Sequence, residues 1–138
     1  MRKMAMSGFG VALGLAIAGH ALAQGVSPDL KGSYAPGGDC TKEPRVIIGD
    51  VLTVIAGGKS TRYAPLDACY SCAGGARYEG IEVWVTYLDS KKEPAYPMFR
   101  VNADEKRGNL VVDKNDIQTA PTPVRAVAMA SPLKKCAR

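Results

Sequence analysis

Four cysteines limit how this 138-residue chain can fold: Cys40, Cys69, Cys72 and Cys136. An even number of cysteines in a small exported domain is typical of a disulfide framework, and four of them allow three pairings. We favour a bond between Cys69 and Cys72 and a second bond between Cys40 and Cys136, with the two mixed pairings as alternatives. Closing the long loop from Cys40 to Cys136 would stabilise the fold by about 4 kcal/mol in the chain-entropy description.

The N-terminal residues predict export. Residues 1–3 are Met-Arg-Lys, residues 4–19 form an apolar run without charge, and residues 21–23 are Ala-Leu-Ala, the small-residue pattern that signal peptidase recognises. We therefore expect a signal peptide at 1–23, cleavage near Ala23, and one periplasmic or secreted domain at 24–138. A membrane anchor is disfavoured because the apolar run is shorter than the roughly 20 residues of a spanning helix.

Charge and histidine content argue against several functions. The formal net charge is +5, and loss of Arg2 and Lys3 with the signal peptide lowers it to +3, with bases and acids interleaved. A nucleic-acid-binding protein normally shows a one-sided basic stripe. The single histidine, His20, lies within the expected signal peptide, so the mature domain has no Ser-His or Cys-His pair. We expect no catalysis, no cofactor and no nucleic-acid partner.

Short β-branched runs, broken by glycine and proline, predict a mainly β domain: a small antiparallel barrel or curled sheet with a short C-terminal helix. The clearest element is a hairpin around Gly57-Gly58, because a two-residue glycine loop suits turns that need positive φ. It would pair Val54 with Thr61 and Leu52 with Tyr63. The expected strands are 45–48, 51–56, 59–64, 81–88, 97–101 and 109–113.

The remaining segments are expected to be irregular or helical. Residues 24–31 have few apolar anchors and predict a mobile lead-in, and the turn-rich residues 32–40 would be anchored by Tyr34 and Cys40. The charged residues 102–108 predict a solvated turn.

A short helix is expected near the C-terminus. Thr122 would be its N-cap and Pro123 its first residue, and the helix would end at Ala130. A strand over Val124–Ala128 is the alternative.

The Cys69-x-x-Cys72 motif could serve redox chemistry, but it precedes Gly-Gly and a strand, whereas a thioredoxin-like motif adjoins a helix. A structural disulfide is favoured, and zinc is rejected because Cys40 and Cys136 stand alone. Glu79 and Glu82 could form a carboxylate pair for glycosidic chemistry, but ordinary exposed glutamates are favoured.

A more specific binding group lies between Cys72 and the end of the strand 81–88. Arg77, Tyr78 and Trp84 are of the residue types that are over-represented at binding hot spots. A glycine loop at Gly74-Gly75, braced by a disulfide, would present Arg77 and Tyr78 with a low ordering cost. The competing interpretation is that both aromatic residues only pack within the sheet.

Gly75-Ala76-Arg77-Tyr78, followed after a short spacer by Trp84, resembles the central motif of the periplasmic C-type lysozyme inhibitors. That resemblance implies a small exported β-barrel that blocks the catalytic cleft of a lysozyme with a Ser-Gly-x-x-Tyr loop and a later Lys-Gly loop. Gly74 stands here where the family has serine, and Lys91-Lys92 is the nearest basic pair after the tryptophan.

We therefore predict an exported binding or inhibitor module, directed at a partner such as a lysozyme or another envelope hydrolase. Its predicted binding residues are Gly74, Gly75, Arg77, Tyr78 and Trp84. The alternatives are a structural envelope protein without catalytic activity, and a thiol-disulfide protein that uses Cys69 and Cys72.

Overall fold

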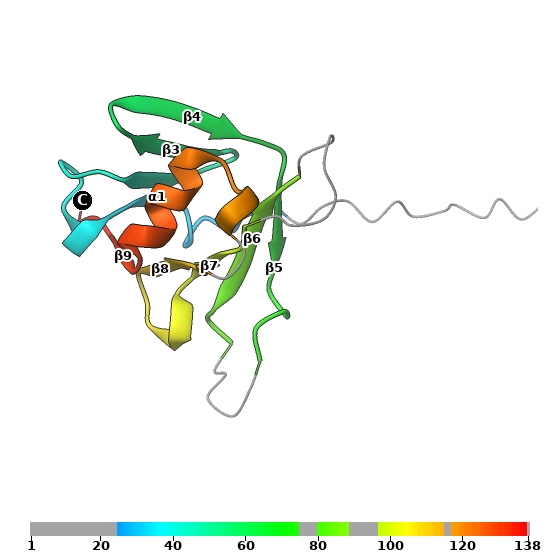
Figure 1. Ribbon diagram of the computed structural model, residues 1–138. Coiled ribbons are helices and arrows are strands. Elements are labelled where there is room, and N and C mark those ends of the chain that lie inside the picture. Colours follow the sequence, from blue (N-terminus) through cyan, green and yellow to red (C-terminus); the bar gives the residue numbers. More distant parts are fainter. Residues whose placement is uncertain (1–24, 75–79, 89–96, 115–116, 138) are drawn as a thin grey trace, which may run out of the picture.

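The computed structural model describes residues 25–74, 80–88, 97–114 and 117–137. Within these residues, nine antiparallel strands form a nearly closed barrel, and one short α-helix lies near the C-terminus (Figure 1). This confirms the fold class predicted from the sequence. No helix in the described ranges has the length and apolar character needed to cross a membrane.

The strands are β1 (Gly32–Ala35), β2 (Arg45–Ile48), β3 (Leu52–Ala56), β4 (Lys59–Tyr63), β5 (Leu66–Cys69), β6 (Val83–Tyr87), β7 (Phe99–Val101), β8 (Asn109–Val112) and β9 (Leu133–Lys135). The helices are α1 (Thr122–Ala130) and the 3-10 turns η1 (Pro36–Gly38), η2 (Ala103–Glu105) and η3 (Ile117–Thr119).

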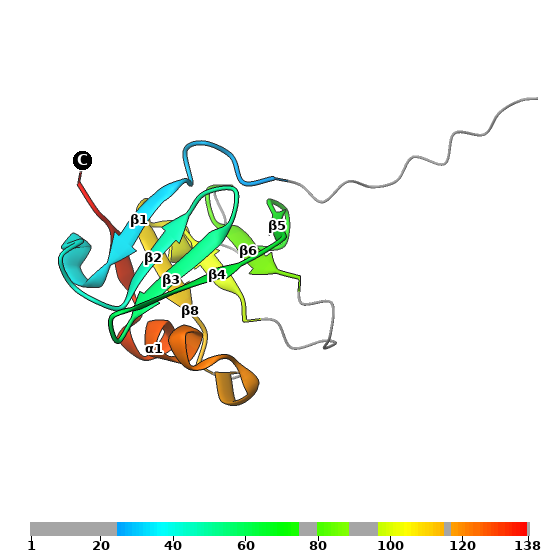
Figure 2. The same ribbon diagram turned by 90° about the horizontal axis from the view of Figure 1, so that it is seen from above.

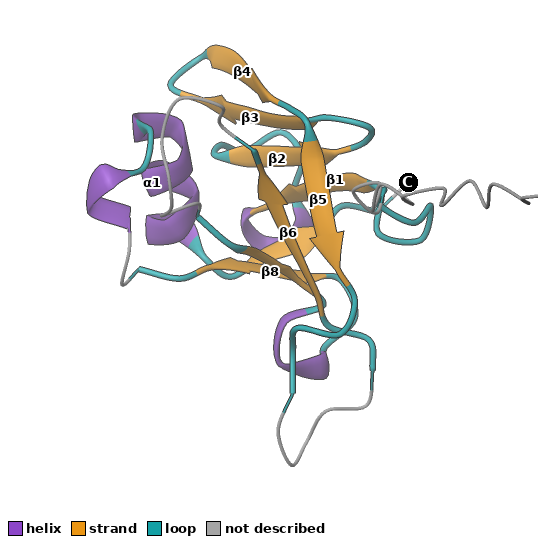
Figure 3. Cartoon of the chain, turned by 90° about the vertical axis from the view of Figure 1, so that its right-hand side faces the viewer, coloured by secondary structure: helices purple, strands orange, loops and turns teal. Residues whose placement is uncertain are grey.

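The order of the strands in the sheet is β4-β3-β2-β1-β9-β8-β7-β6-β5. The last strand, β9, is inserted between β1 and β8, so the two ends of the domain meet in the middle of the sheet. Strands β4 and β5 are consecutive in the chain but lie at the two ends of the order. The chain turns a corner between them, so the two strands run in different directions (Figure 3). At this seam the ring of Tyr63 stacks on Tyr87, with 4.5 Å between centroids.

The β3–β4 hairpin has the predicted register, with Val54 opposite Thr61 and Leu52 opposite Tyr63. Gly57 and Gly58 have φ values of 59° and 72°. Residues with side chains rarely adopt this left-handed region, so the glycines determine where the chain reverses.

Apolar side chains fill the interior of the barrel because successive strand residues point alternately inward and outward. The largest fully buried side chains include Tyr34, Ile48, Leu52, Phe99, Leu110 and Leu133. Helix α1 lies against β3 and β8 and buries Val124, Val127 and Ala128 (Figure 2). The helix is stabilised by that packing, because an isolated nine-residue helix is unstable in water.

The helix was predicted correctly, but its cap was not. Pro121, not Thr122, is the N-cap residue, and no side chain caps the helix. The Thr122 hydroxyl accepts a hydrogen bond from Arg125 (3.1 Å) instead.

Three strands were not predicted from the sequence: β1, β5 and β9. Each is short, and each depends on partners far away in the chain. Strand β1, for example, lies between β2 and β9. Gly32 allows this arrangement, because a Cβ at this position would lie 2.7 Å from Cε of Lys135, whose side chain crosses it.

The prediction of a mobile lead-in is wrong for residues 25–31, the described part of that segment. Leu30 is only 2 % exposed, and its carbonyl accepts a hydrogen bond from the Tyr34 hydroxyl (2.8 Å). The Asp29 carbonyl accepts another from Nζ of Lys135 (2.7 Å). Tyr34 anchors the start of the fold as expected, and burial raises its pKa to about 12.

Both favoured disulfides are present. Cys40 is bonded to Cys136, 96 residues away, and Cys69 is bonded to Cys72. The first bond connects the segment after β1 to the end of β9, and the second closes a short ring at the end of β5.

Candidate functional site

A row of three side chains crosses the outer face of the barrel. Cys69 of β5 lies opposite Trp84 of β6, and Trp84 lies opposite Arg100 of β7. We call these residues the Trp84 row. All three are half-buried, whereas Val83 and Val85, the chain neighbours of Trp84, point into the core. The alternation along β6 therefore presents Trp84 outward.

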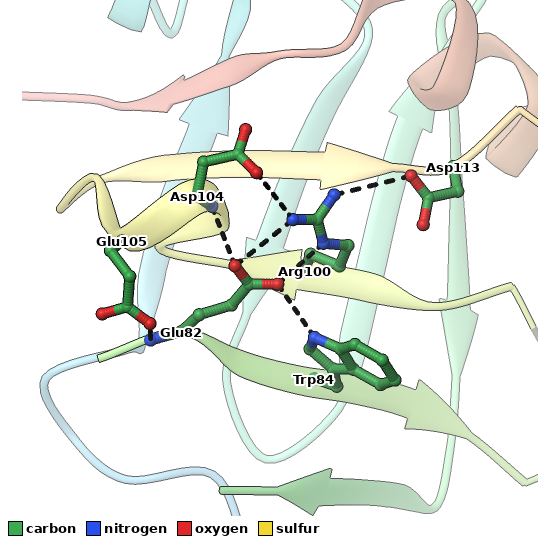
Figure 4. Close-up of polar contacts among 6 residues, drawn as sticks. All are labelled: Glu82, Trp84, Arg100, Asp104, Glu105 and Asp113. Atoms are coloured by element: carbon green, nitrogen blue, oxygen red, sulfur yellow. Dashed lines mark hydrogen bonds and ion pairs between the residues drawn. The ribbon is translucent and has the colours of Figure 1, made fainter. Parts of the chain in front are cut away.

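A buried carboxylate supports this row. Glu82 is 5 % exposed, and its oxygens accept hydrogen bonds from Nε1 of Trp84 (2.8 Å), Nε of Arg100 (2.7 Å) and the backbone N–H of Asp104 (2.8 Å) (Figure 4). Burial by itself would raise the pKa of Glu82, but the hydrogen bonds from Arg100, Trp84 and Asp104 outweigh it and hold the pKa below its usual value. Glu82 is therefore ionised and fully engaged.

Arg100 is the centre of the charged network. Its guanidinium contacts Glu82, Oδ1 of Asp104 at 2.9 Å and Oδ1 of Asp113 at 3.6 Å. The hydrogen bond to Glu82 is the largest reason why the pKa of Arg100 is raised. The planar guanidinium suits this role because it can donate to several carboxylates at once.

The turn between β7 and β8 contains three non-glycine residues with positive φ: Asn102 (54°), Asp104 (57°) and Glu105 (59°). Such conformations are uncommon, and each costs about 1 kcal/mol or more. Asn102 and Ala103 are buried, so the prediction of a solvated turn is wrong for its first half. Asp104, Lys106 and Arg107 are exposed, as expected.

Contacts with the start of β6 compensate for this strain. Nδ2 of Asn102 donates to the Ile81 carbonyl (3.1 Å), and its Oδ1 accepts the Gly108 N–H (2.9 Å). The Glu105 carboxylate accepts the N–H groups of Ile81 (3.0 Å) and Glu82 (3.3 Å). The turn is therefore docked on the residues that lead into β6.

The connection between β5 and β6 has two described ends, residues 70–74 and 80–82, which we call its roots. The Cys69–Cys72 disulfide holds the first root, and the hydrogen bonds to Glu82, Asn102 and Glu105 hold the second. Gly74 is exposed at the end of the first root.

The structure describes two of the five predicted binding residues, Gly74 and Trp84. Gly75, Arg77 and Tyr78 lie outside the described residues, as does Glu79, so their grouping stays a prediction. The expectation that Glu82 is exposed is wrong, because Glu82 is buried in its ion pair with Arg100.

Sequence reasoning missed Arg100 and Asn102. The signal for Arg100 was its place between the inward-facing Phe99 and Val101 in the predicted strand. The signal for Asn102 was its residue type at the start of a turn, since asparagine tolerates the left-handed conformation better than most residues.

A concave region lies beside the Cys40–Cys136 disulfide. Its volume is about 360 Å³, and Lys31, Gly32, Lys135 and Cys136 are among its lining residues. Both lysines are engaged: Lys31 pairs with Asp50 at 2.7 Å, and Lys135 holds the Asp29 carbonyl.

In the described part of the chain, no three His, Cys, Asp or Glu side chains are arranged to hold a metal ion. No family model, curated protein or solved structure matches this chain.

Proposed function

We propose that the protein is an exported binding module whose protein partner docks on the Trp84 row and the adjoining β5–β6 connection. The main supporting observation is that both roots of this connection are held, one by a disulfide and the other by charge-assisted hydrogen bonds. Holding both ends of a surface connection reduces the ordering cost of binding.

The Trp84 row has the chemistry of a protein-binding anchor. Tryptophan and arginine are enriched at energetically important interface positions, because they combine a large contact area with a polar group. The hydrogen bonds to Glu82 fix the orientation of both Trp84 and Arg100 before a partner arrives. The row therefore offers a pre-oriented surface.

The proposed partner is a lysozyme or another envelope hydrolase. This part of the proposal rests on the resemblance of Gly75-Ala76-Arg77-Tyr78 and Trp84 to the C-type lysozyme inhibitors. In the sequence, Gly75-Ala76-Arg77-Tyr78 lies between the two held roots. Both ends of the connection therefore have the support that an inhibitory loop requires.

An inhibition assay tests the proposal. Purified mature protein is expected to inhibit a C-type lysozyme, and Arg77→Ala and Tyr78→Ala are each expected to weaken inhibition by at least tenfold. Arg62→Ala, an exposed arginine on β4, is the matched control and should inhibit like the wild type. Absence of inhibition of every C-type lysozyme tested would refute the lysozyme version of the proposal.

The competing function is a structural envelope protein without catalytic activity. It is supported by the ion pair between the Glu82 carboxylate and the Arg100 guanidinium, because both charged groups already have a partner within the chain. Capture experiments with envelope extract separate the two functions: a binding module retains a partner that Arg77→Ala or Tyr78→Ala releases, and a structural protein shows no such dependence.

A further inference from the structure

The side chain of Tyr70 holds the first described residues of the chain. Its hydroxyl accepts a hydrogen bond from the Ser27 N–H (2.7 Å) and donates one to the Gly25 carbonyl (2.9 Å). One phenol thus satisfies two backbone groups that lie more than 40 residues earlier in the sequence.

The held segment covers part of the hydrophobic core. Val26 packs against the core cluster, and Leu30 belongs to it. The end of the segment has tethers of its own, the Tyr34 and Lys135 side chains at the carbonyls of Leu30 and Asp29. Release of Tyr70 would therefore free residues 25 and 26 and the Ser27 N–H and uncover the surface beneath Val26, while the carbonyls of Ser27 and Pro28 kept their hydrogen bonds to Leu30 and Lys31.

Tyr70 lies inside the ring that the second disulfide closes. The bond between Cys69 and Cys72 encloses only Tyr70 and Ser71, so it restricts the backbone from which the Tyr70 ring projects. Cys69 is half-buried at the end of β5, and Cys72 is exposed to solvent. A reductant can therefore approach the Cys72 sulfur.

We propose that the Cys69–Cys72 disulfide is a redox-sensitive latch for the N-terminal segment. A thiolate of a dithiol reductant attacks Sγ of Cys72, and Cys69 leaves as a thiolate that takes up a proton. The second thiolate of the reductant then attacks the mixed disulfide and releases Cys72. The reductant becomes a disulfide, Cys69 and Cys72 become thiols, and the two electrons balance. Tyr70 then loses the restraint of the disulfide ring and residues 25 and 26 detach, while the Cys40–Cys136 bond keeps the barrel closed.

This device does not require the proposed hydrolase partner, because its decisive contacts join Tyr70 to Gly25 and Ser27. Cys69 belongs both to the latch and to the Trp84 row, but the Ser27 amide reports on the N-terminal segment alone. It also differs from a thiol-disulfide enzyme. The dithiol acts on this protein, and the outcome is a change in which part of its surface is covered.

The amide proton of Ser27 is a direct reporter, since it donates to the Tyr70 hydroxyl. In C69A/C72A, which retains the Cys40–Cys136 bond, we expect hydrogen exchange of this amide to accelerate at least tenfold, whereas core amides such as Val54 keep their protection. Tyr70→Phe, with the disulfide intact, should accelerate hydrogen exchange of the Ser27 amide to a similar extent. Combining the three substitutions should add little, because both changes remove the same contact.

Unchanged Ser27 exchange in a folded C69A/C72A variant would overturn the proposal, as would unchanged exchange in Tyr70→Phe. Tyr34→Phe is the control. It removes the hydrogen bond from the Tyr34 hydroxyl to the Leu30 carbonyl, a tether that does not depend on the state of the Cys69–Cys72 disulfide.

If C69A/C72A does not fold, dithiothreitol titration of the wild type gives the answer, with disulfide state followed by mass spectrometry. The proposal predicts that Ser27 exchange rises with the opening of Cys69–Cys72. A rise that instead follows the opening of Cys40–Cys136 would overturn it.

Discussion

The two disulfides of this protein act on different scales. Cys40–Cys136 spans 96 residues and joins the segments that follow β1 and β9, two neighbouring strands in the middle of the sheet. Cys69–Cys72 spans three residues at the end of β5, the last strand in the sheet order. The first bond closes the fold, and the second shapes a local surface beside Trp84. The Cys40–Cys136 region thus serves the stability of the whole fold, and the Cys69–Cys72 region serves the presentation of the candidate binding surface.

Removal of the long-range bond should have the largest effect. In the chain-entropy description, C40A/C136A loses about 4–5 kcal/mol of unfolding free energy, and C69A/C72A loses about 2 kcal/mol because its loop is short. Denaturant unfolding monitored by circular dichroism measures both losses. Equal losses would mean that the two bonds do not divide their roles in this way.

Arg100→Ala tests the charged network in the second region. The substitution leaves the Glu82 carboxylate buried without its main cation, and removal of one partner of a buried ion pair typically costs about 3 kcal/mol or more. Arg62→Ala, on the exposed strand β4, should change the unfolding free energy by less than about 0.5 kcal/mol. A small effect at Arg100 would show that solvent already screens the pair.

The pH dependence of stability isolates Glu82. The pKa of this carboxyl is lowered in the folded protein, so its ionised form stabilises the fold above the unfolded-state pKa of about 4.3, and this stabilisation is lost as pH falls through the folded-state value. The wild type should therefore lose more unfolding free energy than Glu82→Gln between about pH 5 and pH 3. Parallel pH profiles for the two proteins would contradict this assignment.

Glu105→Gln should have the smallest effect. The amide oxygen can still accept a hydrogen bond from Ile81, but without the charge that strengthens the present contact. We expect a loss of about 1 kcal/mol, together with faster exchange of the Ile81 and Glu82 amides. If these amides exchange as in the wild type, the turn does not hold the second root.

Sequence reasoning succeeded where local rules determine the structure. Gly57-Gly58 determines the hairpin and its register. Residue spacing also favoured the observed disulfide pairing.

Sequence reasoning failed where contacts between residues far apart in the chain determine the structure. Strand β9 exists because β1 and β8 lie on either side of it, and its own residues, Leu133-Lys134-Lys135, carry little strand signal. The ordering of residues 25–31 depends on the nearby Tyr34 and also on Tyr70 and Lys135, which lie far away in the sequence. The burial of Glu82 likewise depends on Arg100, which lies on a different strand.

The most direct test of the proposed binding surface is hydrogen exchange of the protein, alone and saturated with a C-type lysozyme. The account predicts added protection at residues 69–74 and 83–87, and unchanged exchange in the β3–β4 hairpin (residues 52–63). Protection centred on the hairpin, or no protection at saturating lysozyme, would contradict it.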